Sequence, residues 1–304
     1  MASSKTATKP PQDAAGAGAS DLVSVEAGLD ALDSIVAQHT SLGQALRQKA
    51  LPPLLGLLLV LAVWQGAYSL HVTTAYKLPS PADVWSSLGD LWTAGTLFEI
   101  IWTSVWRGLS GFLAAVAIGT PIGLIVARVK PVRAALGPVL SGLQSLPSVA
   151  WVPAAVIWLG INDSMMYAVI LLGAVPSIAN GLVAGIDQVP PLFLRAGRTL
   201  GASGLVGARH VLLPAALPGY LAGLKQGWAF SWRSLMAAEL VASSPDLGIG
   251  LGRYLENQRE FSDMAGVLLG IILILFVGIA IELLVFSPIE RRVLRNRGLL
   301  AAAR

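Results

Sequence analysis

The sequence predicts an all-α, polytopic membrane protein with about six transmembrane helices. Hydrophobic residues make up 55% of the chain and charged residues 12%, with a mean hydropathy of +0.69. These values lie outside the range of soluble globular domains. The apolar residues also gather in runs of about 20, the length that crosses ~30 Å of hydrocarbon. The length of the chain therefore indicates a number of transmembrane helices rather than a number of soluble domains.

Residues 1–50 are predicted to form a cytoplasmic N-terminal tail. The stretch from Met1 to Ser20 is rich in Ala, Ser, Gly, Lys and Pro without periodicity, so we expect it to be disordered. No signal peptide is expected, because the first apolar run begins only near Leu51. Between Ser24 and Arg47, apolar residues recur at near-helical spacing and indicate an amphipathic helix. This helix either lies on the surface or contacts a partner or the membrane.

Six apolar segments follow, at residues 51–70, 109–127, 139–159, 165–186, 220–241 and 264–286. Several contain proline, which membrane helices tolerate when their neighbours satisfy the freed backbone groups. The prolines in question are Pro121, Pro147, Pro153 and Pro176. We therefore expect kinked helices that pack on one another. Residues 51–290 are predicted as the transmembrane domain and residues 291–304 as a basic cytoplasmic tail.

The distribution of Lys and Arg predicts the orientation of these segments. With the N-terminus placed inside, the inside segments hold Lys5, Lys9, Arg47, Lys49, Arg128, Lys130, Arg133, Arg195, Arg198, Arg209, Arg291, Arg292, Arg295, Arg297 and Arg304. The outside segments hold only Lys77, Arg107, Arg253 and Arg259. The positive-inside rule then predicts that both termini are cytoplasmic. Short basic clusters of this kind are typical of topology signals that meet anionic lipid, so we expect membrane lipid and no nucleic acid as a partner.

One cytoplasmic loop, residues 188–218, is long and has a patterned sequence. Pro190 and Pro191 favour the start of a helix, and Gly201 favours its end in the left-handed conformation. A second helix is predicted from about Ser203 to Leu213, where Pro214 stops it. The loop is therefore expected to form two short helices around a glycine turn on the cytoplasmic face.

The same residues resemble the signature loop of ABC importer permeases, which contains Glu-Ala-Ala, a glycine core and a Leu-Pro ending. The matching positions are Arg195, Ala196 and Gly197; Leu200, Gly201, Ala202 and Ser203; and Leu213 and Pro214. The resemblance implies that this loop docks into a groove of a separate ATPase subunit and transmits its movement, with Ala196, Gly197, Gly201 and Ala202 allowing close approach. The leading Glu is Arg195 in this chain, so the electrostatic contact of that Glu is not carried over.

The likeness covers roughly residues 77–292 and extends to other motifs. Four further motifs are similar to the taurine, alkanesulfonate and nitrate branch of these permeases. They are Leu78-Pro79-Ser80-Pro81 before a helical stretch, the segments at 146–153 and 158–161, and Glu290-Arg291-Arg292. The resemblance implies a type I ABC importer permease fold in a bacterial inner membrane. It also implies a second copy of the chain, or else a related permease, two ATPase subunits that bind ATP and Mg²⁺, and an extracytoplasmic solute-binding protein. The implied cargo is an aliphatic sulfonate or taurine, with nitrate next, and no cofactor is expected in this chain.

Three ionisable residues lie within the predicted span at 220–241. Lys225, Arg233 and Glu239 each cost at least ~2.5 kcal/mol at mid-membrane, so such groups usually face a bundle interior or an aqueous cavity. Together with Trp228 and Trp232 they are candidates for the translocation path, where an anion would meet positive charge and indole N–H groups. Alternatively, Lys225 snorkels towards the cytoplasm and Arg233 pairs with Glu239. Glu282 near the end of the last span is predicted to be structural, meeting an arginine of the tail.

Several other classes of function are disfavoured by what the sequence lacks. The chain has no cysteine and only three scattered histidines, so we expect no metal site. No Walker phosphate-binding loop occurs, so ATP hydrolysis is expected in a separate subunit and not in this chain. The glycines at 248–252 lack the βαβ context of a dinucleotide loop. The remaining alternatives are an ion-coupled secondary transporter, which would show inverted repeats, and a membrane scaffold, which gives no reason for the patterned loop.

Overall fold

The computed structural model describes residues 51–74, 76–242, 244 and 247–297. The predicted N-terminal tail with its amphipathic helix, and residues 298–304 of the basic tail, lie outside the described residues. The chain divides into two units, Met1–Leu61 with Ala303–Arg304 and Ala62–Ala302. Within the described residues every regular element is a helix, as the sequence predicts.

Helix α3, Leu51–Ser69, corresponds to the first predicted span, and none of its residues is buried. It begins in the first unit and ends in the second. Helix α4, Pro81–Thr93, begins with a capping box. The Ser80 backbone N–H donates to the Asp83 carboxylate at 2.7 Å, and the Asp83 N–H donates to the Ser80 hydroxyl at 3.2 Å. The motif at Leu78–Pro81 thus precedes a helix as predicted.

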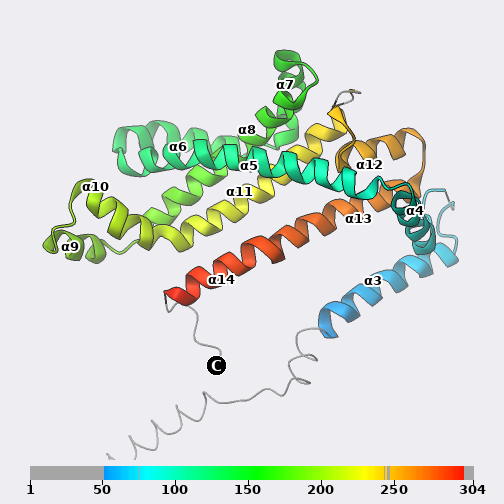
Figure 1. Cartoon of the computed structure of the whole chain (residues 1–304), viewed down its shortest axis with the longest axis horizontal. Helices are drawn as coiled ribbons and strands as arrows, with labels where there is room; N and C mark the ends of the chain where they lie inside the picture. Colours follow the sequence, from blue (N-terminus) through cyan, green and yellow to red (C-terminus); the bar gives the residue numbers. More distant parts are fainter. Residues whose placement is uncertain (1–50, 75, 243, 245–246, 298–304) are drawn as a thin grey trace, which may run out of the picture. The chain divides into compact units, whose positions relative to one another are not determined.

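Three long helices form the centre of the second unit: α5 (Leu97–Arg128), α8 (Asp163–Asp187) and α11 (Leu213–Val241). They lie side by side in Figure 1, with α8 in contact with both of the others. Glycines line these interfaces: Gly111, Gly119 and Gly123 of α5 face α8, and Gly181 and Gly185 of α8 face Gly223 and Gly219 of α11. Helices in a bilayer associate largely by close packing, which such small residues permit.

The predicted span at 139–159 is not one continuous helix, because the chain breaks there. Helix α6 (Lys130–Ser145) is followed by a 3₁₀ turn, η1 (Ser148–Trp151), and then by α7 (Val152–Leu159), with a bend of 99° across the break. Leu146 at the break is extended, with φ −74° and ψ 132°. Proline disfavours the helical conformation in the residue before it, and Pro147 follows Leu146. The predicted kink is therefore a complete interruption.

Two other helices begin earlier than predicted. Helix α5 starts at Leu97 rather than near 109, so Arg107, which the orientation scheme places in an outside loop, lies within a helix. Helix α11 starts at Leu213 rather than near 220. After the short α12 (Leu251–Glu260), α13 (Met264–Ile281) continues through a π-helical turn, η4 (Glu282–Phe286), into α14 (Ser287–Asn296).

Among the described residues, four helical stretches are long and apolar enough to span a membrane: Leu51–Ser69, Leu97–Arg128, Asp163–Asp187 and Met264–Asn296. The bent pair Lys130–Ser145 and Ser148–Leu159 adds a fifth if it counts as one span. Helix α11 covers the fifth predicted segment, 220–241, with 29 residues, but it carries three charged side chains and does not reach the same apolarity. It lies instead against α8 and α5. The all-α polytopic fold class is confirmed.

Candidate functional site

The sequence predicts the patterned loop at residues 188–218. Its part between α8 and α11, residues 188–212, is called the coupling segment from here on, and residues 213–218 belong to α11. Its first helix, α9 (Pro191–Thr199), starts on Pro191. Gly201 follows it with φ +83°. The N–H of Gly201 donates to the carbonyl of Arg198 at 3.0 Å, and that of Ala202 to the carbonyl of Gly197 at 2.8 Å, the hydrogen bonds of a Schellman cap. The predicted helix and glycine turn are confirmed.

The second half of the coupling segment differs from the prediction. Helix α10 (Gly204–Gly207) passes into a π-helical turn, η2 (Ala208–Leu212), and α11 begins directly afterwards with Pro214 in its first turn. Pro214 therefore does not stop the helix. A π-helical turn disturbs the regular hydrogen-bond ladder, and proline, which has no N–H to contribute, fits just beyond it.

The coupling segment exposes both apolar and basic side chains. Leu200 is 87% exposed, Leu192 68% and Phe193 51%. Arg195, Ala196, Arg198, Gly201 and Ser203 are also exposed, Ala202 is half-buried, and Leu213 and Pro214 are exposed at the start of α11. Gly197 is the exception: it is buried, and a Cβ there would lie 2.9 Å from Cγ2 of Val211. Its small size makes room within the coupling segment itself.

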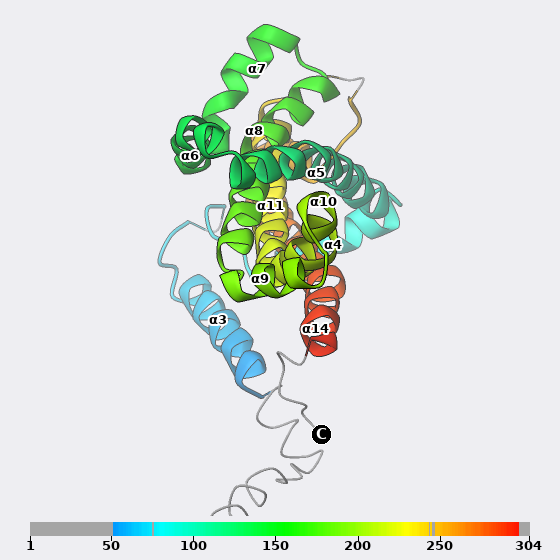
Figure 2. The same cartoon turned by 90° about the vertical axis from the view of Figure 1, so that its left-hand side faces the viewer.

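The coupling segment is the tip of a helical hairpin whose arms are α8 and α11 (Figures 1 and 2). The arms cross at close range where Gly185 meets Gly219 and Gly181 meets Gly223. Reasoning from the sequence missed this crossing, although a signal was present. Gly-Leu-Val-Ala-Gly at 181–185 and Gly-Tyr-Leu-Ala-Gly at 219–223 are both small-residue repeats of the kind that brings membrane helices together.

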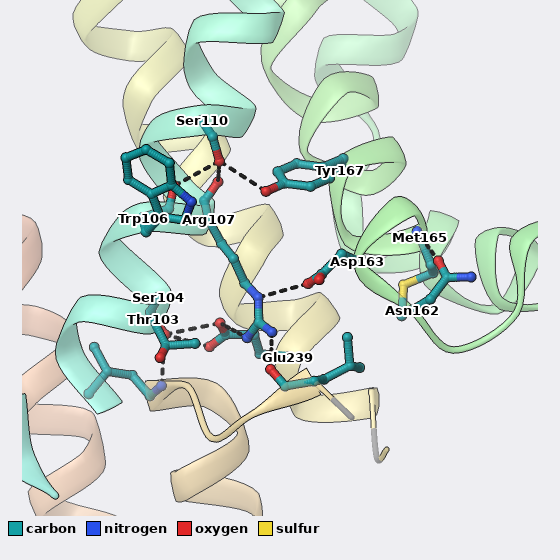
Figure 3. Close-up of polar contacts among 12 residues, drawn as sticks. Thr103, Ser104, Trp106, Arg107, Ser110, Asn162, Asp163, Met165, Tyr167 and Glu239 are labelled. Carbon is teal, nitrogen blue, oxygen red and sulfur yellow. Dashed lines mark hydrogen bonds and ion pairs between the residues drawn. The ribbon is translucent and has the colours of Figure 1, made fainter. Parts of the chain in front are cut away.

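Glu239, predicted for the translocation path, is instead fully buried in a polar cluster (Figure 3). Its carboxylate accepts hydrogen bonds from the Ser104 hydroxyl at 2.8 and 3.0 Å and from the backbone N–H of Gly252 at 3.0 Å. The guanidinium of Arg107 lies 3.4 Å away. The alternative prediction, a pair between Glu239 and Arg233, is wrong, because Arg233 donates to the carbonyl of Ala229 and the cation beside Glu239 is Arg107. Glu239 therefore joins α11 to α5 and to the first turn of α12.

Arg107 is the second centre of this cluster and was missed because it was assigned to a loop. It is 7% exposed. Its Nε donates to the Asp163 carboxylate at 2.9 Å, at the start of α8, and its guanidinium also donates to the carbonyl of Leu247. Figure 3 shows the side chain extending from α5 between Glu239 and Asp163. Arg107 thus links α5, α8, α11 and the segment before α12.

The glycine-rich stretch at 248–252 completes the cluster. A Cβ on Gly250 would lie 2.6 Å from Cδ of Glu239, and one on Gly252 would lie 2.7 Å from its Cβ. The two glycines therefore let the start of α12 reach the buried carboxylate.

On the same short helix, burial and the nearby carboxylates of Asp263 and Asp90 raise the pKa of Tyr254 to about 12, so its phenol stays protonated at physiological pH.

Lys225 forms ion pairs with two glutamates of the last helices. Its ammonium contacts the carboxylate of Glu282 and lies 3.7 Å from that of Glu290. Glu282 thus meets Lys225, not an arginine of the tail as predicted. The exposed fractions of the three side chains are 42%, 34% and 46%. Lys225 connects α11 to η4 and α14 at the border of the bundle.

The remaining path candidates border a groove of about 590 Å³ between α11 and the last helices. Trp228 and Trp232 are buried and stack at 6.0 Å between ring centroids. The indole N–H of Trp232 has no hydrogen-bond acceptor among the described residues. Arg233 is exposed, lies 4.6 Å above the ring of Phe230, and borders a second, smaller groove next to the break at Pro147. The structure therefore groups Trp228, Trp232 and Arg233 and separates them from Glu239.

Comparison with known proteins agrees with this architecture. Residues 119–294 match the family model described as binding-protein-dependent transport system inner membrane component. The chain is 32% identical over 234 residues to the taurine transport system permease protein TauC of Escherichia coli K12, covering 75% of this chain and 83% of that protein. It is 31% identical over 245 residues to the putative aliphatic sulfonates transport permease protein SsuC of Bacillus subtilis 168, covering 80% and 87%.

A solved structure shares the fold. One chain of the MetNI methionine ABC transporter, captured in inward-facing conformations, superposes with a TM-score of 0.57 at 19% identity, covering 66% of this chain and 97% of that chain. With a family model that matches most of the described bundle and with relatives that align over most of their length, the chain belongs to the binding-protein-dependent transport system inner membrane components, in the branch of the taurine and aliphatic sulfonate ABC permeases.

Proposed function

We propose that this chain is the membrane-spanning subunit of an ATP-driven importer of a small organic anion, an aliphatic sulfonate or taurine, with nitrate as the next choice. The names of its relatives support this class of cargo. An ion-coupled secondary transporter has no such support, because the family comprises components of binding-protein-dependent systems. The chain would lie in the bacterial inner membrane with both termini in the cytoplasm, since the basic residues concentrate on that side.

The coupling segment would dock onto a separate ATPase subunit. Its exposed apolar side chains, Leu192, Phe193 and Leu200, carry this proposal, because apolar side chains that project from a membrane protein beyond its helical bundle mark an interaction site. Arg195, in place of the Glu of the family signature, presents a guanidinium there and would face an acidic group of the ATPase. ATP and Mg²⁺ would be bound by the ATPase and not by this chain.

In the working complex two copies of the chain would form a pore with two ATPase subunits beneath, and an extracytoplasmic binding protein would deliver the anion. A two-fold assembly of this kind reuses one surface of each copy. ATP binding would draw the ATPases together and move both coupling segments. Because each segment is the tip of the α8–α11 hairpin, this movement would tilt both arms and favour an outward-open state, which hydrolysis would reset.

The anion would pass Trp228, Trp232 and Arg233. Arg233 contributes an exposed guanidinium, and Trp232 contributes a buried indole N–H for which the described residues supply no acceptor; both kinds of donor suit sulfonate oxygens. Lys225 and Glu239 are not part of this proposal. The former is paired with Glu282 and the latter is fully buried in the Arg107 cluster.

The docking proposal is tested by placing a charge on the most exposed apolar residue of the coupling segment. Leu200→Asp should leave folding intact and abolish both co-purification with the ATPase and ATP-dependent uptake of labelled taurine into vesicles. Phe261→Asp, at a 78% exposed residue beyond the opposite end of α11, is the matched control and should retain both. Uptake by the wild-type chain in vesicles without any ATPase, driven by a gradient alone, would refute the proposed function.

A further inference from the structure

Both ends of the coupling segment are fixed by polar contacts to helices outside the α8–α11 hairpin. At the entry, Asp187 is the last residue of α8, and both of its carboxylate oxygens accept from the guanidinium of Arg133 in α6, at 2.9 and 2.5 Å. This is a bidentate contact, which fixes the angle between the two groups as well as their distance.

At the exit, the first turn of α11 is held by the C-terminal helix. The guanidinium of Arg297, which directly follows α14, donates to the backbone carbonyl of Pro214. Farther along α11, Lys225 pairs with Glu282 and Glu290. Since α11 and the α13–α14 helix run in opposite directions, these contacts hold the end of the C-terminal helix along the first half of α11. Figure 2 shows α6 and α14 on different sides of α9 and α10.

The positions of these contacts coincide with local weak points of the helices. Pro214 follows the π-helical turn η2, and Glu282 opens the π-helical turn η4. Regular hydrogen bonding is disturbed in both turns, so each is a place where a helix can bend instead of moving as a rigid body. Lys225 bridges η4 by pairing with Glu282 at its start and Glu290 beyond it, and Arg297 holds Pro214 just beyond η2. Such contacts limit the bend and pass the displacement to the neighbouring helix.

These contacts contribute little to stability. Arg133 and Asp187 are 46% and 44% exposed, and exposed ion pairs seldom add much to the free energy of folding. Arg128 is the last residue of α5, two residues before the start of α6. It is exposed and makes no side-chain hydrogen bond or ion pair among the described residues. The same holds for Arg295 of α14 within the part of the chain that the structure describes. Arg133 and Arg297 therefore differ from Arg128 and Arg295 in their contacts and not in their charge.

We propose that the Arg133–Asp187 and Arg297–Pro214 contacts are clamps that hold the two ends of the coupling segment to α6 and α14. A displacement of the segment is then transmitted to four helices rather than to the hairpin alone. Arg133, Asp187 and Arg297 are positioning residues for transport and not only topology signals. The inference rests on the proposed function, since it assumes that an ATPase moves this segment.

The test compares matched arginines in vesicles that contain the chain, its ATPase and its binding protein. Arg133→Gln and Arg297→Gln should still bind the ATPase and should transport about two- to fivefold fewer taurine molecules per ATP hydrolysed, as expected for the loss of an exposed polar contact. Arg128→Gln and Arg295→Gln remove the same charge from the same regions and should keep the wild-type ratio. The exchange Arg133→Asp with Asp187→Arg keeps the total charge and should restore the ratio, whereas each single reversal should lower it.

The possible results separate the clamps from the proposed function. Equal ratios in all variants would overturn the clamps and leave ATP-driven transport standing. Equal losses in Arg133→Gln and Arg128→Gln would also overturn them, because the arginines would then act only through their charge in membrane topology. Transport by the wild-type complex without any ATP hydrolysis by the ATPase would refute the proposed function itself.

Discussion

A Cβ atom on Gly223 would lie 2.5 Å from the Cα atom of Gly181, so the backbones of α11 and α8 touch at this point. One turn closer to the coupling segment, Gly219 and Gly185 meet in the same way, with 2.6 Å between a Cβ on Gly219 and the Cα of Gly185. Within a bilayer such crossings hold helices together by close packing. Close packing therefore joins the two arms of the hairpin that carries the coupling segment.

Replacing Gly223 with Ala should separate the two arms of the hairpin. The added methyl group collides with the backbone of α8, which cannot rotate away as a side chain would, so we expect a loss of about 1–3 kcal/mol in stability. The measurement is the thermal midpoint of the purified protein in detergent.

Gly137→Ala is the matched control, because nothing lies within 4 Å of a Cβ at that position of α6. Alanine favours a helix over glycine by about 1 kcal/mol, so this variant should be neutral or more stable. A thermal midpoint for Gly223→Ala equal to that of wild type would contradict the crossing.

Glu239→Ala should destabilise the protein more than any substitution of the exposed charges. It removes the acceptor of Ser104 and Gly252 and leaves Arg107 buried with less compensation. Breaking a buried ion pair from one side typically costs about 3–5 kcal/mol. Glu239→Gln keeps the shape and one acceptor oxygen and should lose less. If the Ala and Gln variants both melted at the wild-type temperature, the cluster would have no structural role.

The sequence was sufficient for the elements whose signal is local. Runs of apolar residues predicted α3, α8 and α13, and Pro191 and Gly201 predicted the ends of α9. These features depend on neighbouring residues only. Hydropathy and proline and glycine chemistry act over a few residues, so they can be recognised without knowing the fold.

Features that depend on distant partners could not be predicted in the same way. Arg107 and Glu239 are 132 residues apart in the sequence. Helical periodicity predicts which face of α11 carries Glu239, but it does not predict which helix packs against that face. Arg107 itself interrupts the apolar run in the first half of α5, so the segment predicted from 109 began after it and left Arg107 outside the helix. The glycine repeats of α8 and α11 can be read in the sequence, but their pairing could be predicted only with the knowledge that the two helices form a hairpin.

Gly201→Pro should abolish uptake while leaving membrane insertion intact. Proline holds φ near −65° and has no N–H, whereas Gly201 has φ +83° and donates to the carbonyl of Arg198. The change would therefore reorient α9 relative to α10, although neither lies in a membrane span. The measurements are vesicle uptake and the amount of protein in the membrane.

Gly201→Asn is the control for this substitution, because asparagine tolerates the left-handed conformation that ends many helices. It should retain most of the uptake. Wild-type uptake by the proline variant would show that coupling does not require this turn.

Arg233→Ala should lower the uptake of the anion without lowering the amount of folded protein. The guanidinium is exposed and lies 4.6 Å from the centre of the Phe230 ring. Within the described part of the chain its one hydrogen bond goes to the carbonyl of Ala229 in its own helix, at 3.0 Å, so little of the described fold depends on it. A hydrogen bond to a charged group contributes about 1.5 kcal/mol or more, which corresponds to roughly a tenfold loss of transport at low concentration of the anion. Arg233→Lys keeps the charge but not the planar donor pair and should fall between the two. Uptake of labelled taurine, divided by protein abundance in the same membranes, is the measurement. If abundance falls in step with uptake, Arg233 is a structural residue and the anion follows another route.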